Sequence, residues 1–198
     1  HYDHLEKKTI KYLYKKNIIF IVPRGVDKYL INFGCPKEKI VVMDWWDKFL
    51  YKDLEINMTP SQHFSRRKLN DLNKSMWCSY SLIGKNKKVF FSGDGGYGKH
   101  FKKIGERFNG FDFCFIDIGS WNEHWRQVHL FPDEAIKAFK DLKGKVMIPA
   151  HWAAYNLALH KWNEPIKLLM KANKKEKINI ETPKIGQIFI PGKTKTTN

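Results

Sequence analysis

Cysteine is scarce in this sequence. The 198 residues include only three, Cys35, Cys78 and Cys114, which are widely spaced and form no Cys-x-x-Cys pair. An odd number of scattered thiols does not suit the disulfide framework of a small secreted domain. We therefore expect free thiols and a reducing compartment.

Long hydrophobic runs are also lacking. No stretch approaches the roughly 20 apolar residues that a membrane-spanning helix needs. The sequence predicts a protein that is cytoplasmic or peripheral to a membrane, and the question of a signal or anchor ahead of residue 1 stays open. No internal repeat of solenoid period is visible, so one domain is the default expectation.

Acidic residues are few relative to basic ones. Asp and Glu number 20 against 36 Lys and Arg, and the formal net charge is +16. Such an excess favours an anionic partner, namely nucleic acid, an anionic membrane surface or a phosphate-bearing substrate. A plain solvated surface is the alternative interpretation of the many lysines. No recognised RNA-binding module is present, so we do not expect a nucleic-acid partner.

Apolar residues are frequent enough for a folded core. The hydrophobic content of 42% and the aromatic content of 15% exclude a purely disordered chain. We expect one domain over 1–192 and a disordered tail over 193–198. Apolar patterns predict helices over 5–13, 26–33, 99–108, 132–142 and 164–174, and strands over 18–22, 40–43, 54–58, 76–83, 88–92, 113–116, 145–148, 178–180 and 187–190.

Candidate metal ligands begin at the first residue. The segment His1-Tyr2-Asp3-His4 places two imidazoles and a carboxylate within one turn of chain, and these groups are the usual ligands of zinc and related ions. They cannot complete a coordination shell alone. Further candidates follow apolar runs that end at one sheet edge, and these candidates are His63, Asp94 and His151. The basic segment 65–74 beside His63, with Arg66 and Arg67, is expected to be a loop at the site entrance.

A glycine-rich motif offers a competing interpretation. Residues 93–98 satisfy Gly-x-Gly-x-x-Gly between an expected strand and an expected helix. A dinucleotide-binding loop presents bare amides to a pyrophosphate, and the carboxylate of Asp94 would repel that group. A metal-binding Asp94 meets no such conflict, and glycines let the backbone turn tightly beside the ions. The metal site is therefore favoured.

The order of these residues resembles the metallo-β-lactamase superfamily, whose first motif reads His-x-His-x-Asp-His. The chain starts at the second histidine of that motif, so we interpret it as a fragment. In finer detail it resembles the family of phospholipases D that hydrolyse N-acyl-phosphatidylethanolamine, with its bacterial relatives. The stretches that carry this resemblance are His1–His4, Thr59–Phe64, Trp77–Tyr80, Phe90–Tyr97, Ile104–Phe108, Ile118–Trp121, His129, Pro132–Ala135, His151–Trp152 and Glu164–Pro165.

The resemblance implies a four-layer αββα sandwich, with part of the first sheet missing from this chain, and a site for two zinc ions. One zinc ion would be held by His1, His63 and the absent first histidine, and that site would be incomplete here. The other would be held by Asp3, His4 and His151, with Asp94 bridging the two ions. Tyr2 and His129 would line the substrate site and contact the phosphate.

The resemblance also implies an activity. A hydroxide shared by the two ions would attack phosphorus and release N-acylethanolamine and phosphatidic acid. Asp94 would orient the hydroxide, and His129 would assist as a proton donor. The anionic lipid substrate would agree with the basic charge and with a peripheral membrane surface.

Three departures from the family pattern stand beside this resemblance. Residue 95 is glycine where threonine is frequent, residue 153 is alanine where glycine is frequent, and the first histidine is absent. A different hydrolase of the same fold, acting on a sugar-phosphate lactone or a nucleic-acid phosphodiester, stays an alternative. A metal-free anion-binding protein is a second alternative. We also expect this chain to be less stable or less soluble than one extended at its N-terminus. The identity of the metal, zinc or else iron or manganese, stays open.

Overall fold

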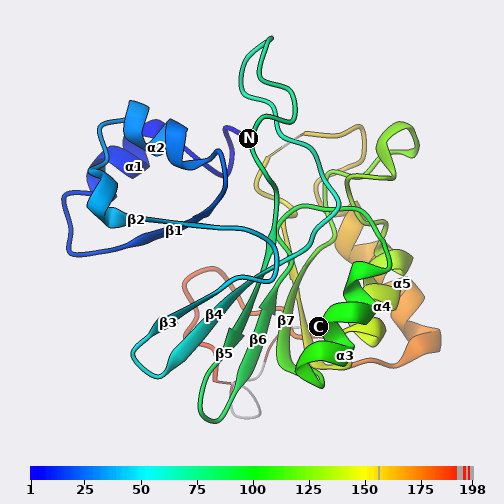
Figure 1. The fold of residues 1–198 in the computed structure, drawn as a ribbon. Coiled ribbons are helices and arrows are strands. Elements are labelled where there is room, and N and C mark those ends of the chain that lie inside the picture. The colour runs from blue at the N-terminus through cyan, green and yellow to red at the C-terminus, as the bar shows by residue number, and fades with distance from the viewer. Residues whose placement is uncertain (156, 191–193, 195, 197–198) are drawn as a thin grey trace.

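The computed structural model describes residues 1–155, 157–190, 194 and 196. Within these residues the strands form two sheets (Figure 1). The smaller sheet belongs to an N-terminal unit in which β1 and β2 pair in parallel and two helices pack beside them. The elements of this unit are α1 (Lys7–Leu13), β1 (Phe20–Pro23), α2 (Asp27–Asn32), a 3-10 turn (Lys37–Lys39) and β2 (Ile40–Met43).

The larger sheet has six strands in the order β3-β4-β5-β6-β7-β8. Neighbours from β3 to β6 are antiparallel, whereas β6, β7 and β8 run parallel to one another. The strands are β3 (Lys48–Tyr51), β4 (Leu54–Thr59), β5 (Ser79–Ile83), β6 (Lys88–Phe91), β7 (Phe111–Asp117) and β8 (Gly144–Ala150).

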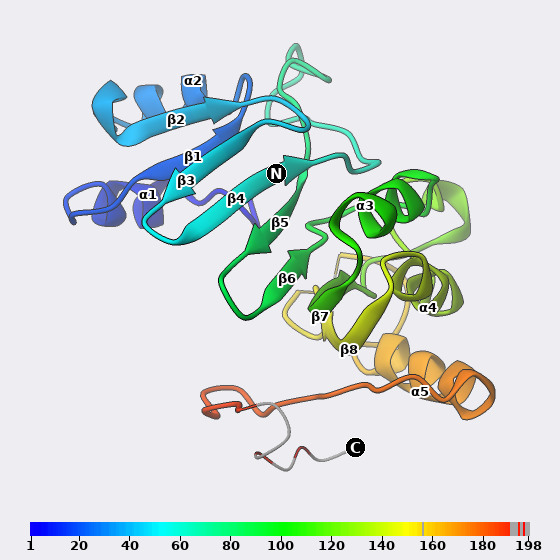
Figure 2. The same ribbon diagram turned by 60° about the horizontal axis from the view of Figure 1, so that its bottom comes forward.

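Helices α3 (His100–Phe108), α4 (Pro132–Asp141) and α5 (Glu164–Glu176) cover one face of this sheet (Figures 1 and 2). Because side chains alternate along a strand, Phe90 and Cys114 face these helices and are fully buried there with Ile104. Each such side chain contributes about 1.5–3 kcal/mol of burial free energy, so this layer anchors the sheet.

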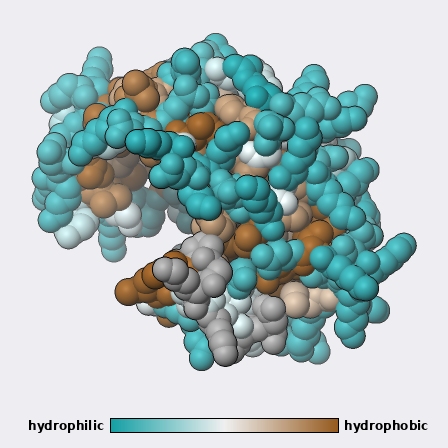
Figure 3. Space-filling model, turned by 90° about the horizontal axis from the view of Figure 1, so that it is seen from below, coloured by the Kyte–Doolittle hydropathy of each residue, from teal (hydrophilic) through white to brown (hydrophobic). Residues whose placement is uncertain are grey.

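The opposite face of the sheet is less covered. Its side chains include Phe91, which is 47% exposed, and the N-terminal unit contacts it where the hydroxyl of Tyr80 donates to the carbonyl of Ile21 at 2.9 Å. Seen from below, polar side chains cover most of the visible surface, with apolar patches between them and a hollow beside the N-terminal unit (Figure 3).

Strand direction decides where the loops meet. Strand β4 is antiparallel to β5, which is antiparallel to β6, so β4 runs the same way as β6, β7 and β8. The carboxyl ends of these four strands therefore lie along one edge of the sheet, at the top of Figure 1.

Most of the predicted elements are present, with a few corrections. The expected strand over 187–190 is wrong, because no strand pairs with it and Ile188 is 82% exposed. The expected strand near 178–180 is reduced to a single bridge between Met147 and Ile180. Strand β3 was not predicted. Most of the tail predicted over 193–198 lies outside the described residues.

Two expectations from composition can be compared with the structure. The three cysteines are free thiols, as predicted. Among the helices of the described residues, none combines the length and the hydrophobicity that crossing a bilayer requires.

Candidate metal centre

Three predicted ligands follow strands that end at the same edge of the sheet. His63 comes after β4, Asp94 after β6, and His151 directly after β8. The N-terminal segment crosses this edge, where the Leu5 amide closes a turn onto the His1 carbonyl at 3.1 Å. The guanidinium of Arg67 also donates to that carbonyl, at 2.9 Å. All six predicted ligands are thus brought together, although their role as ligands stays a prediction.

One group of side chains surrounds His4. Its Nε2 lies 3.0 Å from Oδ2 of Asp94 and 3.2 Å from Oδ2 of Asp3. Nε2 of His151 lies 3.5 Å from Oδ1 of Asp94 and 3.7 Å from Oδ2 of Asp3. The ligand atoms of these four residues lie within 4.8 Å of one another, a spacing that one metal ion can span.

A second group consists of His1, His63 and Asp94. Nδ1 of His1 lies 3.3 Å from Nε2 of His63, and the three ligand atoms are again within 4.8 Å of one another. Nδ1 of His63 donates to the carbonyl of Val128 at 2.9 Å. This bond leaves the lone pair of the neutral ring on Nε2, which faces the cluster. Asp94 belongs to both groups, as a bridging carboxylate would.

Two buried atoms in this cluster lack a hydrogen-bond partner within the described part of the chain. They are Nε2 of His1 and Oδ1 of Asp94. Buried polar atoms are almost always paired, so two unpaired acceptors on neighbouring residues need an explanation. A cation bound to Asp94 would satisfy its Oδ1, and the residues of the two groups therefore fit a metal centre.

The pKa values of the cluster fit the same chemistry. Burial lowers the pKa of His63 to about 4, so this imidazole is neutral and able to coordinate. Burial raises the pKa of Asp94, but the hydrogen bond from His4 and the charge of His151 outweigh it and bring the value to about 2. Burial likewise opposes the charge on His151, yet the hydrogen bond to Asp117 and the nearby carboxylates raise its pKa to about 9. Carboxylates that hold this proton can hold a metal cation instead.

Asp117 was not identified from the sequence, although it ends β7 at the same edge. Its side chain is fully buried, and Oδ1 accepts from Nδ1 of His151 at 3.2 Å and from the amide of Gly119 at 2.9 Å. Oδ2 accepts from Nδ1 of His129 at 3.1 Å. The rings of His129 and His151 stack, with centroids 5.5 Å apart and planes 6° apart. A carboxylate that orients a ligand histidine in this way is typical of metal sites.

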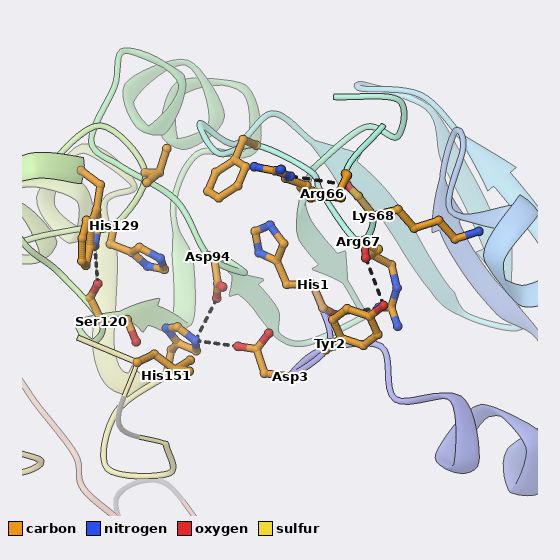
Figure 4. A pocket seen from close by; sticks show the side chains of 15 residues that line it. His1, Tyr2, Asp3, Arg66, Arg67, Lys68, Asp94, Ser120, His129 and His151 are labelled. Atoms are coloured by element: carbon orange, nitrogen blue, oxygen red, sulfur yellow. Dashed lines mark hydrogen bonds and ion pairs between the residues drawn. The ribbon is translucent and has the colours of Figure 1, made fainter. Parts of the chain in front are cut away.

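A cavity of about 780 Å³ opens beside the cluster (Figure 4). Tyr2 and His129 are among the residues that line it, and their contact with a substrate stays a prediction. The Tyr2 hydroxyl donates to the Arg67 carbonyl at 3.0 Å, and the Tyr2 ring lies beneath the Arg67 guanidinium. The basic loop stands at the entrance, as predicted. The other lining residues are His1, Asp3, Phe64, Arg66, Arg67, Lys68, Leu69, Asp94, Ser120, Trp125, Val128, His151 and Leu157.

The glycine-rich segment 93–98 serves packing rather than a nucleotide. A Cβ atom at Gly95 would lie 2.5 Å from Oγ of Ser61, and one at Gly96 would clash with the carbonyl of Gln127. The amide of Gly96 donates to the carbonyl of Gln62 at 2.8 Å, so it is not free for a phosphate. Close contact with the Gln127 backbone explains glycine at position 96, whereas at position 95, where the resembling family often has threonine, the neighbour is the hydroxyl of Ser61.

The sequence that forms this cluster matches a known protein family. The family model of the beta-lactamase superfamily domain matches residues 1–152, a range that contains all six predicted ligands. The chain belongs to the metallo-β-lactamase superfamily.

Similar proteins come from bacteria and eukaryotes. An uncharacterized protein of Mycobacterium tuberculosis is 35% identical over 195 residues, which cover 96% of this chain and 52% of that protein. N-acyl-phosphatidylethanolamine-hydrolyzing phospholipase D 1 of Caenorhabditis elegans is 30% identical over 96% of this chain and 58% of its own length. The mitochondrial phospholipase D of the same name from Saccharomyces cerevisiae is 33% identical over 83% of this chain and 37% of its own length. The chain thus spans about half the length of these relatives.

Solved structures show the fold. Isothiocyanate hydrolase from Delia radicum gut bacteria superposes with a TM-score of 0.74 at 18% identity, covering 96% of this chain and 73% of that one. Igni18, a metallo hydrolase from Ignicoccus hospitalis, gives a TM-score of 0.68 at 18% identity over 100% of this chain and 76% of that one. The predicted metallo-β-lactamase fold is therefore confirmed.

Proposed function

We propose that this chain is a metal-dependent hydrolase that cleaves the phosphodiester of N-acyl-phosphatidylethanolamine as a phospholipase D does. The observation that carries the proposal is the pair of ligand groups that share Asp94 at the wall of a cavity flanked by basic side chains. The names of the yeast and nematode relatives support the lipid substrate.

Two divalent cations, with zinc as first choice, fit the donor set. Asp3, His4, Asp94 and His151 would hold one ion. His1, His63 and Asp94 would hold the other and leave coordination positions open. When bound, such ions lower the pKa of water toward 7 and offset the charge that develops on a phosphoryl oxygen.

The remaining side chains have roles toward the substrate. His129 donates its Nδ1 proton to Asp117, and in the doubly protonated ring the other nitrogen would also carry a proton and would donate it to a phosphoryl oxygen in the cavity. Arg66 and Lys68 are exposed at the cavity and attract an anionic headgroup. In the reaction a water oxygen bonds to phosphorus and the bond from phosphorus to the ethanolamine oxygen breaks. That oxygen takes a proton and leaves as N-acylethanolamine, and phosphatidic acid remains.

Apolar side chains in the cavity wall favour a lipid over the two alternative substrates. Phe64, Leu69, Trp125 and Leu157 line the same cavity as the ligands. A sugar-phosphate lactone or a nucleic-acid backbone has no comparable apolar surface to place against them. The volume of about 780 Å³ lies within the usual range for small-molecule pockets, so it suits a headgroup and the start of the chains.

The test is the identity of the products formed in ¹⁸O-labelled water. Vesicles containing N-acyl-phosphatidylethanolamine are incubated with the zinc-loaded protein, and lipids are analysed by mass spectrometry. The proposal predicts N-acylethanolamine without label and phosphatidic acid carrying one ¹⁸O. Formation of diacylglycerol, or no turnover of this lipid with turnover of a soluble phosphodiester, would contradict the substrate assignment. No turnover of either would favour the anion-binding alternative.

A further inference from the structure

The loop over residues 65–75 exposes two leucines beside the cavity. Leu69 is 91% exposed and also lines the cavity, so it lies at the rim. Leu72, three residues further on, is 56% exposed. Single exposed leucines are ordinary on protein surfaces. The position of Leu69 at the cavity gives it a meaning that exposure alone does not.

Hydrogen bonds at its base fix the conformation of this loop. Oγ of Ser65 donates to the carbonyl of Ser75 at 2.7 Å, and the Asn73 amide donates to the carbonyl of Ser65 at 2.7 Å. The side-chain oxygen of Asn73 accepts in turn from the Ser65 amide at 3.2 Å. The two ends of the loop are therefore clamped together.

Asp71 fixes the tip of the same loop. Its Oδ1 accepts from the amides of Arg67 and Lys68 at 2.9 and 2.7 Å, and its Oδ2 accepts from the hydroxyl of Tyr29 on α2 at 2.7 Å. Leu69 lies between Lys68, whose amide this buried carboxylate binds, and Asp71 itself. The hydrogen bonds of the loop thus hold the apolar side chain of Leu69 in its exposed position.

Cationic side chains flank Leu69 on the cavity side. Arg66 and Lys68 are exposed and line the cavity, and Figure 4 shows them at one side of it. Arg67 points inward, because it donates to the His1 carbonyl and lies 4.1 Å from the Tyr2 ring centroid. The rim therefore combines exposed positive charge with an apolar side chain.

The loop that follows β8 contributes a second apolar rim residue. Leu157 lines the same cavity and is 50% exposed, and Leu159 is 90% exposed in the same loop. Apolar side chains on two separate loops thus line the same cavity as the candidate ligands.

We propose that Leu69 and Leu157, together with Arg66 and Lys68, dock the mouth of the cavity onto an anionic lipid bilayer. This inference rests on the proposed function, because a lipid with three acyl chains is too large for a cavity of about 780 Å³ and must keep its chains in the membrane. Basic side chains are attracted to anionic headgroups, and leucine side chains enter the interface beside them. The formal net charge of +16 is complementary to such a surface.

The test is flotation with vesicles that contain no substrate, made of phosphatidylcholine alone or with phosphatidylglycerol. The wild-type chain is expected to bind the anionic vesicles and to leave them as the salt concentration rises. L69S should weaken binding by about tenfold, and R66Q and K68Q by about fivefold each. L50S is the matched control, because Leu50 is 68% exposed on β3 and outside the cavity wall, and it should bind like the wild type.

Several outcomes would contradict the proposal that this surface binds a membrane. They are equal binding of L69S and the wild type, equal binding to both kinds of vesicle, or a dimer in light scattering that L69S abolishes. Circular dichroism must show that the variants are folded. The wild type is assayed in parallel for hydrolysis of the soluble phosphodiester bis(p-nitrophenyl) phosphate. If vesicle binding depends on Leu69 but the wild type shows no hydrolysis, the docking surface is supported and the hydrolase function is contradicted. If the wild type hydrolyses the phosphodiester but L69S binds vesicles as well as the wild type, the hydrolase function is supported and the docking surface is contradicted.

Discussion

At the scale of single residues, two carboxylates have different tasks. Asp94 lies in both ligand groups and carries an unpaired buried oxygen, which suits direct contact with cations. Asp117 has both oxygens occupied by N–H donors from His129, His151 and Gly119. This one buried carboxylate therefore orients two histidines, the candidate ligand His151 and the cavity residue His129.

Replacing Asp117 by asparagine should weaken metal retention. An amide has one acceptor oxygen where the carboxylate has two, so one of the two imidazoles loses its acceptor and its fixed orientation. We expect a loss of about 10–100-fold in metal affinity, measured by competition with a chromogenic chelator. Asp112→Asn is the control, because Asp112 lies at the other end of β7 and bonds Lys88 and Lys145 instead. Unchanged metal affinity in Asp117→Asn would show that Asp117 has no such role.

The location of the ligands was predictable from the sequence, but the role of Asp117 was not. An apolar run that ends in a histidine or an aspartate is a local signal, and it identified His63, Asp94 and His151. The contacts of Asp117 depend on how the segment that carries His129 folds back over β7, which no local pattern reports. The signal that was present is that Asp117 ends the run Phe111–Asp117 at the ligand edge.

At the scale of elements, the ends of β7 and β8 are packed so closely that a side chain has no room between them. The amide of Ile118 donates to the carbonyl of Ala150 at 3.1 Å, and a Cβ at Gly119 would collide with the carbonyl of His151. This contact sets the position of a predicted ligand from a neighbouring strand.

Gly119→Ala should therefore displace His151 as well as destabilise the fold. The expected loss of unfolding free energy is about 1–3 kcal/mol, as for other overpacked sites, accompanied by a lower metal content. Gly84→Ala, in the turn between β5 and β6, should leave the metal content unchanged, since its Cβ would lie 3.3 Å from the Lys87 carbonyl, at the end of β6 opposite to the candidate ligands. Thermal unfolding and elemental analysis of both variants check this. A Gly119→Ala protein with full metal content would contradict it.

The hydrogen bond between α2 and the 65–75 loop should give a measurable pH dependence of stability. The Tyr29 hydroxyl, with two loop amides, lowers the pKa of Asp71 from 3.8 to about 2. A carboxyl group whose pKa is lowered by folding stabilises the fold at pH values above its ordinary pKa, and that contribution is lost as the pH falls toward about 2. The difference in Tm between the wild type and Asp71→Asn should therefore be full near neutral pH and vanish toward pH 2.

Asp53→Asn, in the exposed turn between β3 and β4, is the control for Asp71. It should follow the wild type throughout the titration. A Tm difference for Asp71→Asn that stays constant through acid pH would mean that the carboxylate adds nothing beyond the amide.

The elements that the sequence did not predict correctly lie at the margins of the fold. Strand β3 is an edge strand with a mostly exposed pattern, so it lacks the alternation that marks a half-buried strand. The residues over 187–190 include the short apolar run Ile188–Ile190, but among the described residues no strand is assigned to pair with them. Pairing partners are a property of the whole fold, and local patterns cannot provide them.

At the scale of the whole molecule, the metal centre joins the N-terminus to the six-stranded sheet. The candidate ligands come from residues 1–4 and from the ends of β4, β6 and β8. An unfolded chain does not bring these groups together, so bound metal stabilises the folded state by an amount that grows with the logarithm of the ratio of free metal to Kd.

Removal of metal should therefore lower the Tm of the whole chain. At a free metal concentration of 100 times Kd the stabilisation is about 2.7 kcal/mol, which corresponds to roughly 5–10 °C for a chain of this size. Thermal unfolding with added zinc and with EDTA measures the difference. Asp94→Asn should show a much smaller shift between the two conditions. An equal Tm with zinc and with EDTA for the wild type would contradict a metal centre assembled by folding.

The most direct test of the central claim is the zinc content of the wild type and of Asp94→Asn, determined by elemental analysis on the same samples used for lipid hydrolysis. Asp94 is the residue shared by both ligand groups, so its loss should affect both sites at once. We expect more than one zinc ion per wild-type chain, with the site of His1 and His63 only partly occupied because the first histidine of the motif is absent, and release of N-acylethanolamine. We expect less than one zinc ion for Asp94→Asn and a loss of activity of at least about a thousandfold. Wild-type chain that hydrolyses the lipid without metal, or an Asp94→Asn variant that keeps its zinc and its activity, would contradict this claim.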